Sequence, residues 1–175
     1  MGKTEICLQL AEKFHTEIIS SDSRQFYRET NVGTAKPSVT ELEQVLHHFI
    51  NSLSIFDAYD VKKFESDAIK LLDQLFIKHD IVIMTGGSGL YLDAICFGFD
   101  EIPDVNPAIR KELILDFENL GIQNLQSRLQ KLDPDYFEKV DIHNPQRLMR
   151  ALEVCIGTGK TYSSFRKMKK NTRTF

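Results

Sequence analysis

The chain has 175 residues, a length typical of one compact domain. Hydrophobic residues make up 42% of the sequence and charged residues 27%, an ordinary globular composition that excludes disordered and fibrous classes. The formal net charge is −3, so the protein is not coated in positive charge. Nucleic-acid binding is not excluded, because it needs only a local basic patch.

The cysteines give no sign of a disulfide framework or a zinc site. Cys7, Cys96 and Cys155 are far apart, odd in number and form no C-x-x-C pair. A reducing cytoplasm is therefore the expected location. No apolar run approaches the roughly 20 residues that span a bilayer, and no signal peptide opens the chain, so we expect no membrane contact.

The first 98 residues carry alternating helix and strand patterns. Ile6, Leu10 and Phe14 recur at helical spacing and predict an amphipathic helix that begins near Lys3. The apolar run at 80–85 is short, β-branched and followed by two glycines, which is typical of a buried parallel strand. Helices are expected at about 3–14, 60–79 and 88–97, and strands at 17–20, 48–50 and 80–85. Ser38 is expected to cap a further short helix, with Glu41 closing a capping box.

The second part of the chain is predicted to be helical. Pro103 and Pro107 mark a linker, and Asn106 is expected to cap the helix that follows it. Asn144 should cap a later helix. The expected helices span about 107–120, 123–131 and 145–156, the last ended by Gly157 and Gly159.

These patterns predict an α/β fold with a parallel sheet flanked by helices, followed by a helical appendage. Residues 1–98 would form the α/β core and residues 99–170 the helical part. Residues 171–175 would return toward the core.

The first chemical signal is Gly2-Lys3-Thr4 at the start of a helix, which matches the end of a phosphate-binding loop. Unpaired N–H groups and the helix dipole favour an anion there. Lys3 would contact phosphate oxygens and the Thr4 hydroxyl would coordinate Mg²⁺. The alternative is an ordinary helix start, because the first glycine of the pattern is absent.

Two further signals follow expected strands. Asp22 lies in a polar turn at a strand end, where open α/β sheets bind ligands, and could act as a general base. A simple Asx-turn is the alternative. Gly86-Gly87-Ser88-Gly89 would let a ligand approach the backbone, with Ser88 near a phosphate or a metal-bound water; a tight strand-to-helix turn is equally compatible.

The basic side chains of the last part suggest a partner with negative charge. Gln146, Arg147 and Arg150 lie on one side of the helix after Asn144 and could bind phosphate or bases, or could form a solvated face. The stretch from residue 160 to 173 holds six basic residues and no acidic one, and could equally be a solvated tail.

Five motifs occur together and in order: GKT at 2–4, EIISSDSRQFY at 17–27, GTAKP at 33–37, GGSGLYL at 86–92 and NPQRLMRALE at 144–153. This combination covers almost the whole chain and resembles the tRNA dimethylallyltransferase (tRNA isopentenyltransferase) family. The resemblance implies a P-loop NTPase-like sheet with a helical insertion domain that binds tRNA. It also implies transfer of a dimethylallyl group from dimethylallyl diphosphate to N6 of adenosine 37, beside the anticodon.

The resemblance also implies roles for individual residues. Gly2, Lys3 and Thr4 would bind the diphosphate, with Mg²⁺ at Thr4 and a water-mediated contact from Ser88. Asp22 would accept the N6 proton, and Lys3 and Ser88 would complete the catalytic set. The tRNA-binding positions would be Asp22, Ser23, Arg24, Gln25, Ser88, Arg110, Gln146, Arg147, Leu148, Met149 and Arg150. The partners would be dimethylallyl diphosphate and the anticodon stem-loop of tRNA, and we expect a monomer.

The sequence departs from the family pattern in three ways. The phosphate loop lacks its first half and the preceding strand, Ser88 stands where threonine is usual, and the family continues well past Phe175. We therefore expect a chain trimmed at both ends. The main rival is a P-loop, ATP-binding small-molecule kinase or ATPase, which would use the same loop, aspartate and Mg²⁺. A non-catalytic RNA-binding module would leave Asp22 unexplained.

Overall fold

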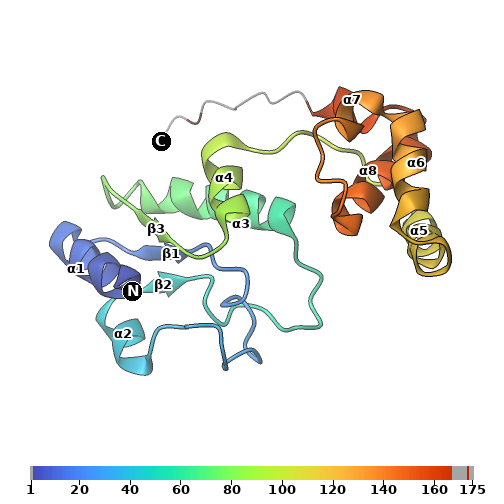
Figure 1. Cartoon of the computed structure of the whole chain (residues 1–175). Coiled ribbons are helices and arrows are strands. Elements are labelled where there is room, and N and C mark those ends of the chain that lie inside the picture. Colours follow the sequence, from blue (N-terminus) through green and yellow to red (C-terminus); the bar gives the residue numbers. More distant parts are fainter. Residues whose placement is uncertain (1, 167–172, 174–175) are drawn as a thin grey trace. The chain divides into compact units, whose positions relative to one another are not determined.

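The computed structural model describes residues 2–166 and residue 173 (Figure 1). The chain divides into two compact units, Met1–Phe99 with Lys170–Phe175, and Asp100–Lys169, and each is described by itself. The first unit contains α1 (Lys3–Phe14), β1 (Ile18–Ser20), α2 (Val39–Gln44), β2 (His47–His48), α3 (Val61–Leu75), β3 (Ile83–Thr85) and α4 (Gly89–Phe97). The second contains α5 (Pro107–Leu120), α6 (Ile122–Leu132), α7 (Pro134–Phe137), α8 (Pro145–Thr158) and α9 (Tyr162–Phe165).

The sheet of the first unit has three parallel strands in the order β2-β1-β3. Ile18 of β1 pairs with His47 on one side and with Ile83 on the other. Because the strands are parallel, β1 and β3 both end at one edge, and the polar turns at residues 21 and 86 follow them there. The prediction of an α/β fold with a parallel sheet flanked by helices is confirmed.

Helices cover both faces of this sheet. Ile18 packs with Leu8 and Ala11 of α1, whereas the next residue, Ile19, packs with Phe64 of α3 and Ile95 of α4. Successive side chains of a strand point to opposite faces, so this alternation places α1 on one face and α3 with α4 on the other. The second face is the larger, and its core includes stacked and edge-on aromatic rings.

Local sequence chemistry sets the helix starts. Ser38 and Glu41 form a reciprocal capping box at the start of α2, and the Asp60 side chain accepts a hydrogen bond from the Lys63 amide at the start of α3. Asn144 caps α8 by accepting from the Arg147 amide. These caps satisfy amide groups that the helix itself leaves unpaired.

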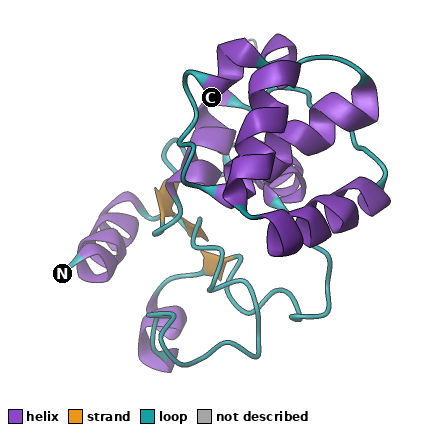
Figure 2. Cartoon of the chain, turned by 45° about the vertical axis from the view of Figure 1, so that its right-hand side comes forward, coloured by secondary structure: helices purple, strands orange, loops and turns teal. Residues whose placement is uncertain are grey.

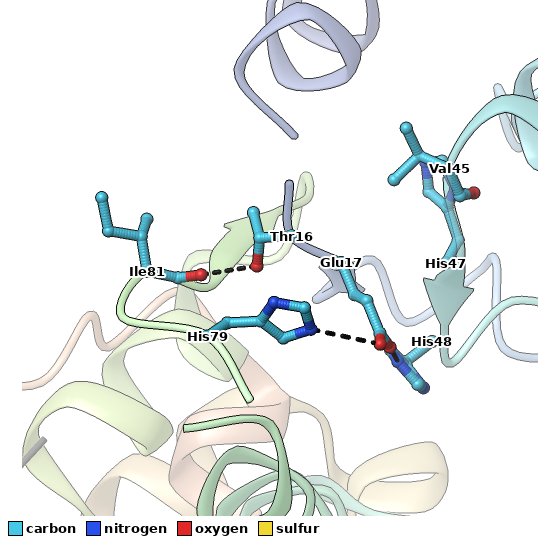
Figure 3. A network of polar contacts seen from close by, with 7 residues as sticks. All are labelled: Thr16, Glu17, Val45, His47, His48, His79 and Ile81. Atoms are coloured by element: carbon cyan, nitrogen blue, oxygen red, sulfur yellow. Dashed lines mark hydrogen bonds and ion pairs between the residues drawn. The ribbon is translucent and has the colours of Figure 1, made fainter. Parts of the chain in front are cut away.

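A polar network joins β1 to two neighbouring segments (Figure 3). Glu17 Oε2 lies 2.5 Å from His48 Nε2, and Glu17 Oε1 lies 3.4 Å from His79 Nε2. Burial opposes ionisation of the Glu17 carboxyl, but hydrogen bonds from both imidazoles and their positive charge outweigh it, so the pKa of Glu17 lies below its usual range. These contacts therefore link β2, and the loop after α3 that carries His79, to Glu17, the residue before β1.

The elements of the described part of the second unit are all helices, joined by loops (Figure 2). Leucines of α5, α6 and α8 form its core, with Tyr136 of α7 at the edge. Asp133 is fully buried, caps α7 through the Tyr136 amide, and accepts from both the amide and the hydroxyl of Ser163 at 2.7 and 2.8 Å. These bonds hold α9 against α7 and satisfy the buried carboxylate.

Several predicted boundaries were wrong. The strand at 80–85 is parallel but only half-buried, because it lies at the edge of the described sheet rather than in its middle. The helix at 60–79 ends at Leu75, the strand at 48–50 is His47–His48, and the short α7 and α9 were missed. Gly157 does not end α8: a Cβ there would lie 2.5 Å from Val105 Cγ1, so this glycine permits close packing inside the helix.

Candidate active site

A small cavity of about 110 Å³ lies where β1 and β3 end and α1 begins. We call it the strand-end cavity. Its polar lining includes Lys3 and Thr4 of α1, Asp22 of the turn after β1, and Gly86 and Gly87 of the turn after β3. Residues that the sequence predicted separately for phosphate binding and for proton transfer are thus brought to one site.

The first amide groups of α1 are available to bind a ligand. Gly2 occupies the N-cap position with φ of 102°, a left-handed conformation that glycine adopts without strain, and no described side chain caps the helix. Lys3 Nζ lies 3.4 Å from the carbonyl oxygen of Gly86, which brings the ammonium group across to the turn after β3. A cation and a helix N-terminus together favour an anion in this cavity.

The Asp22 carboxylate is held by its own turn. Its Oδ1 accepts a hydrogen bond from the Arg24 amide at 3.0 Å, so the Asx-turn foreseen as an alternative is present. Its Oδ2 faces the glycine turn: a Cβ on Gly87 would lie 2.9 Å from that oxygen. The turn therefore fixes a half-buried carboxylate beside the lysine and leaves room around its second oxygen only because residue 87 is glycine.

Ser88 connects the two turns. Its hydroxyl accepts a hydrogen bond from the Ser23 amide at 3.2 Å and lies 3.2 Å from the Ser23 hydroxyl. Ser88 is the N-cap residue of α4 but makes no side-chain cap, because its hydroxyl is directed to Ser23. It does not line the strand-end cavity, so its role toward a metal-bound water stays a prediction.

A second, open cavity of about 650 Å³ begins at Ser23 and Arg24, directly after Asp22. Tyr27 and Tyr91 contribute aromatic surface, and Val32 and Ile55 complete the apolar part of the lining. The turn that carries Asp22 thus lies beside both cavities, and a group bound in the open one could approach the carboxylate.

The amide of Gln25 is directed into the protein. Its oxygen accepts from the Ser20 hydroxyl at 2.9 Å, and its nitrogen donates to the carbonyl groups of Thr34 and Ala35 at 3.2 and 3.0 Å. These bonds hold the segment 33–37 against the strand end. The structure therefore shows a positioning role for Gln25, and its predicted contact with tRNA would require these bonds to be exchanged.

In the second unit, two of the predicted tRNA-binding arginines share one acidic partner. Glu153 Oε2 lies 3.4 Å from Arg110 Nη1 and 3.5 Å from Arg150 Nη1, and Arg110 also donates to the Gln146 side chain. Arg147 is exposed on α8, the helix that also carries Arg150. One carboxylate therefore holds two arginines, and one of these also holds the glutamine, a pattern suited to an anionic partner.

Leu148 and Met149 occupy a different environment from the other predicted tRNA-binding residues. Leu148 is fully buried and Met149 is 3% exposed, and both pack in the core of the helical unit. Any contact of these two residues with tRNA would have to come from the backbone. Half of the basic residues in the run at 160–173, namely Lys167, Lys169 and Lys170, lie outside the described residues.

Sequence reasoning missed His47, which also lines the strand-end cavity. Its Nδ1 donates to the carbonyl oxygen of Val45 at 2.8 Å, which fixes the ring. The pair His47-His48 gave a usable signal, because alternate residues of a strand face opposite sides. His48 accordingly joins the Glu17 network on the other face.

The chemistry of the strand-end cavity fits a magnesium ion. The Thr4 hydroxyl and the Asp22 carboxylate both line it, and hard oxygen ligands of this kind, completed by water and phosphate oxygens, are what Mg²⁺ prefers. Across the described residues, no group of three or more His, Cys, Asp or Glu side chains could hold a metal ion. A magnesium ion here would therefore depend on the diphosphate for several of its ligands.

The sequence profile of a family described as IPP transferase matches residues 25–175. The chain belongs to this family. The family match covers most of the chain, including the turn that carries Ser88 and the arginine-bearing helix α8, and it begins just after Asp22. The resemblance seen in the sequence motifs is confirmed.

Relatives of this chain are named tRNA dimethylallyltransferase. The protein of Flavobacterium johnsoniae is 49% identical over 181 residues, and that of Christiangramia forsetii is 51% identical over 175 residues. Each match covers 100% of this chain but only 59% and 58% of those proteins. The chain thus spans less than three fifths of the length of the curated relatives it matches.

Solved structures support the same fold. A eukaryotic dimethylallyltransferase acting on tRNA matches with a TM-score of 0.72 at 27% identity, covering 98% of this chain and 43% of that one. The full-length tRNA isopentenylpyrophosphate transferase of Bacillus halodurans matches with a TM-score of 0.55 at 32% identity, covering 92% of this chain and 54% of that one. No helix in the part of this chain that the structure describes is both long and apolar enough to cross a membrane.

Proposed function

We propose that the protein containing this chain transfers a dimethylallyl group from dimethylallyl diphosphate to N6 of the adenosine beside the anticodon of tRNA. The observation that carries the proposal is the single cavity lined by Lys3, Thr4 and Asp22 in a member of the IPP transferase family. It supplies a cation, a metal-ligating hydroxyl and a base within one site. Such a protein would act in the cytoplasm, where tRNA is found.

The diphosphate is assigned to the strand-end cavity. Lys3 and the amide groups at the start of α1 would hold its oxygens, and Thr4 would hold Mg²⁺ with it. A bound Mg²⁺ supplies charge neutralisation to the diphosphate. Because negative charge grows on these oxygens as the C1–O bond breaks, groups placed there stabilise the transition state more than the substrate.

The Asp22 carboxylate is assigned the proton. N6 of the adenine forms a bond to C1 of the dimethylallyl group, the C1–O bond breaks, and diphosphate leaves with the electron pair. The N6 nitrogen then carries a positive charge and loses its proton to Asp22. The Arg24 amide fixes the carboxylate in position for this step.

The tRNA is assigned to residues of both units. The target base must leave its stack to reach the carboxylate, and the open cavity beside Ser23 gives it an approach. In the helical unit, the arginines around Glu153 would hold the RNA backbone.

One experiment separates this function from a P-loop kinase or ATPase. The full-length protein is incubated with tRNA and dimethylallyl diphosphate labelled in the prenyl group, and in parallel with ATP labelled in the γ-phosphate. We expect label in tRNA from the first and no release or transfer of phosphate from the second. Phosphate release without prenyl transfer would establish the kinase or ATPase instead.

A further inference from the structure

The open cavity has an exposed apolar rim that the proposed chemistry does not use. The rim consists of Val32, Ile55 and Phe56, whose exposed fractions are 97%, 52% and 89%. Val32 and Ile55 also line the cavity itself. Burying apolar surface is favourable, so three such side chains on adjoining loops call for an explanation.

The loops that carry the rim are braced by hydrogen bonds. Glu29 accepts from the Ser54 hydroxyl at 2.8 Å and from the Ile55 amide at 3.1 Å, and Asp57 accepts from the Ser54 amide at 2.7 Å. Phe56 is thus presented on a turn closed from both sides. Little conformational entropy would be lost when a partner packs on it.

A second brace fixes the other loop. Lys36 Nζ donates to the Tyr27 carbonyl at 2.6 Å, to the Asn31 side chain at 3.1 Å and to the Asn51 side chain at 2.7 Å. Desolvation lowers the pKa of Lys36, as expected for an ammonium group used inside the loops. The braces join the residues around Val32 to those around Phe56, so the rim is one surface.

The size and chemistry of the rim fit an unpaired nucleobase better than a protein. Three side chains can bury far less surface than the roughly 800 Å² per partner that a stable protein interface buries. They match the face of a base, and single-stranded RNA is bound by stacking on aromatic and arginine side chains. Arg24 lines the adjoining cavity, and Arg28 is exposed on the segment between Arg24 and Val32.

We propose that this rim is a stacking platform for an unpaired tRNA base next to the target adenosine, with Phe56 as its main contact. The inference rests on the proposed function and adds a substrate contact to it. The target base would enter the open cavity, and a neighbouring base would stack outside on the rim. The acidic groups nearest the rim, Glu29 and Asp57, are already hydrogen-bonded to the turn.

The test compares three variants of the full-length protein: Phe56→Ala, Phe56→Trp and Ile77→Ala. Ile77 is 85% exposed on the same unit away from both cavities and controls for loss of any exposed apolar side chain. The probe is an anticodon stem-loop RNA, intact or with single loop nucleotides made abasic. We expect Phe56→Ala to weaken RNA affinity about 5- to 100-fold. We expect Phe56→Trp and Ile77→Ala to leave it unchanged, and KM for dimethylallyl diphosphate to stay the same in all.

The abasic series identifies the stacked base. An abasic nucleotide at one position of the loop should weaken RNA binding by the parent protein. The same nucleotide should not weaken RNA binding by Phe56→Ala any further, because both changes remove the same contact. If the parent transfers the prenyl group and Phe56→Ala binds RNA equally well, the rim proposal is overturned and the proposed function stands. If Phe56→Ala changes only the oligomeric state, the rim is a protein contact and the proposal is again overturned. A parent that binds no RNA would overturn the proposed function itself.

Discussion

The Ser88 hydroxyl accepts a hydrogen bond from the Ser23 amide at 3.2 Å, which joins the turn after β3 to the turn after β1. The two turns come from segments 65 residues apart, yet both reach the cavity that Asp22 and Lys3 line. The geometry of the candidate site therefore depends on how closely the glycine turn, which contains Gly86 and Gly87, approaches Asp22.

The glycine turn gives a graded test of that dependence. A Cβ at residue 86 would lie 2.5 Å from the Ser21 carbonyl carbon and 2.7 Å from the Asp22 amide nitrogen, so Gly86→Ala must move backbone. We expect it to lower the free energy of unfolding by about 1–3 kcal/mol and to abolish transfer. The Cβ added by Gly87→Ala would contact only the Asp22 carboxylate, so this variant should reduce transfer with little loss of stability.

Gly89→Ala is the matched control, because a Cβ there meets no atom within 4 Å. It should keep activity and stabilise α4 by about 0.5–1 kcal/mol. For each full-length variant, chemical denaturation measures the free energy of unfolding and a prenyl-transfer assay measures the activity. Equal activity of the Gly86 and Gly89 variants would contradict the close approach of the two turns.

Lys3→Ala should weaken binding of inorganic diphosphate by about 10- to 100-fold. The ammonium group lines the strand-end cavity at the start of α1, where it adds to the positive end of the helix. Lys13→Ala, at the other end of the same helix, is the control and should bind normally. Calorimetric titration gives both affinities, and equal values would remove Lys3 from the anion site.

Arg147 and Arg150 are expected to hold tRNA phosphates. Replacing both with glutamine should change stability by less than about 0.5 kcal/mol, since both are at the surface of α8. It should weaken tRNA binding and reduce the salt dependence by about one unit of slope for each lost phosphate contact. Lys131→Gln, at an exposed position near the end of α6, is the comparison. An unchanged slope would assign both arginines to a solvated face.

The Glu17 network should make stability depend on pH. The pKa of Glu17 is lowered in the folded state, so its contribution is present above the ordinary pKa of about 4.5 and is lost as pH falls through the folded value. Glu17→Gln should therefore destabilise the protein by about 1–3 kcal/mol at neutral pH, and less in acid. Urea titrations at pH 7 and well below pH 4.5, with Glu12→Gln as control, measure the difference. A constant difference at both pH values would contradict this account.

Most of the fold could be predicted because its signals are local. The apolar spacing that begins at Lys3, the cap at Asp60 and the Asn-Pro pairs at the starts of α5 and α8 each act within a few residues. Glycines were less informative. Gly121 and Gly157 look alike in the sequence, yet the first stops a helix at positive φ and the second lets Val105 pack against α8.

The site could be predicted only in part, because its contacts connect distant segments. Lys3 and Asp22 were identified from motifs, but nothing local showed that the Gln25 amide turns inward to Thr34. Nor did spacing along α8 reveal that Glu153 is shared by Arg110 and Arg150, since Arg110 lies on another helix. Such pairings arise from packing, which one sequence does not display.

The most direct test of the account is the rate of prenyl transfer by Asp22→Asn under single-turnover conditions, with labelled dimethylallyl diphosphate and tRNA. Asparagine keeps the size and can keep the hydrogen bond from the Arg24 amide, but it cannot accept the N6 proton. The account predicts a rate about 10²–10⁴ times lower than that of the parent, with tRNA affinity retained. A rate within about threefold of the parent would show that Asp22 is not the base and would contradict the account.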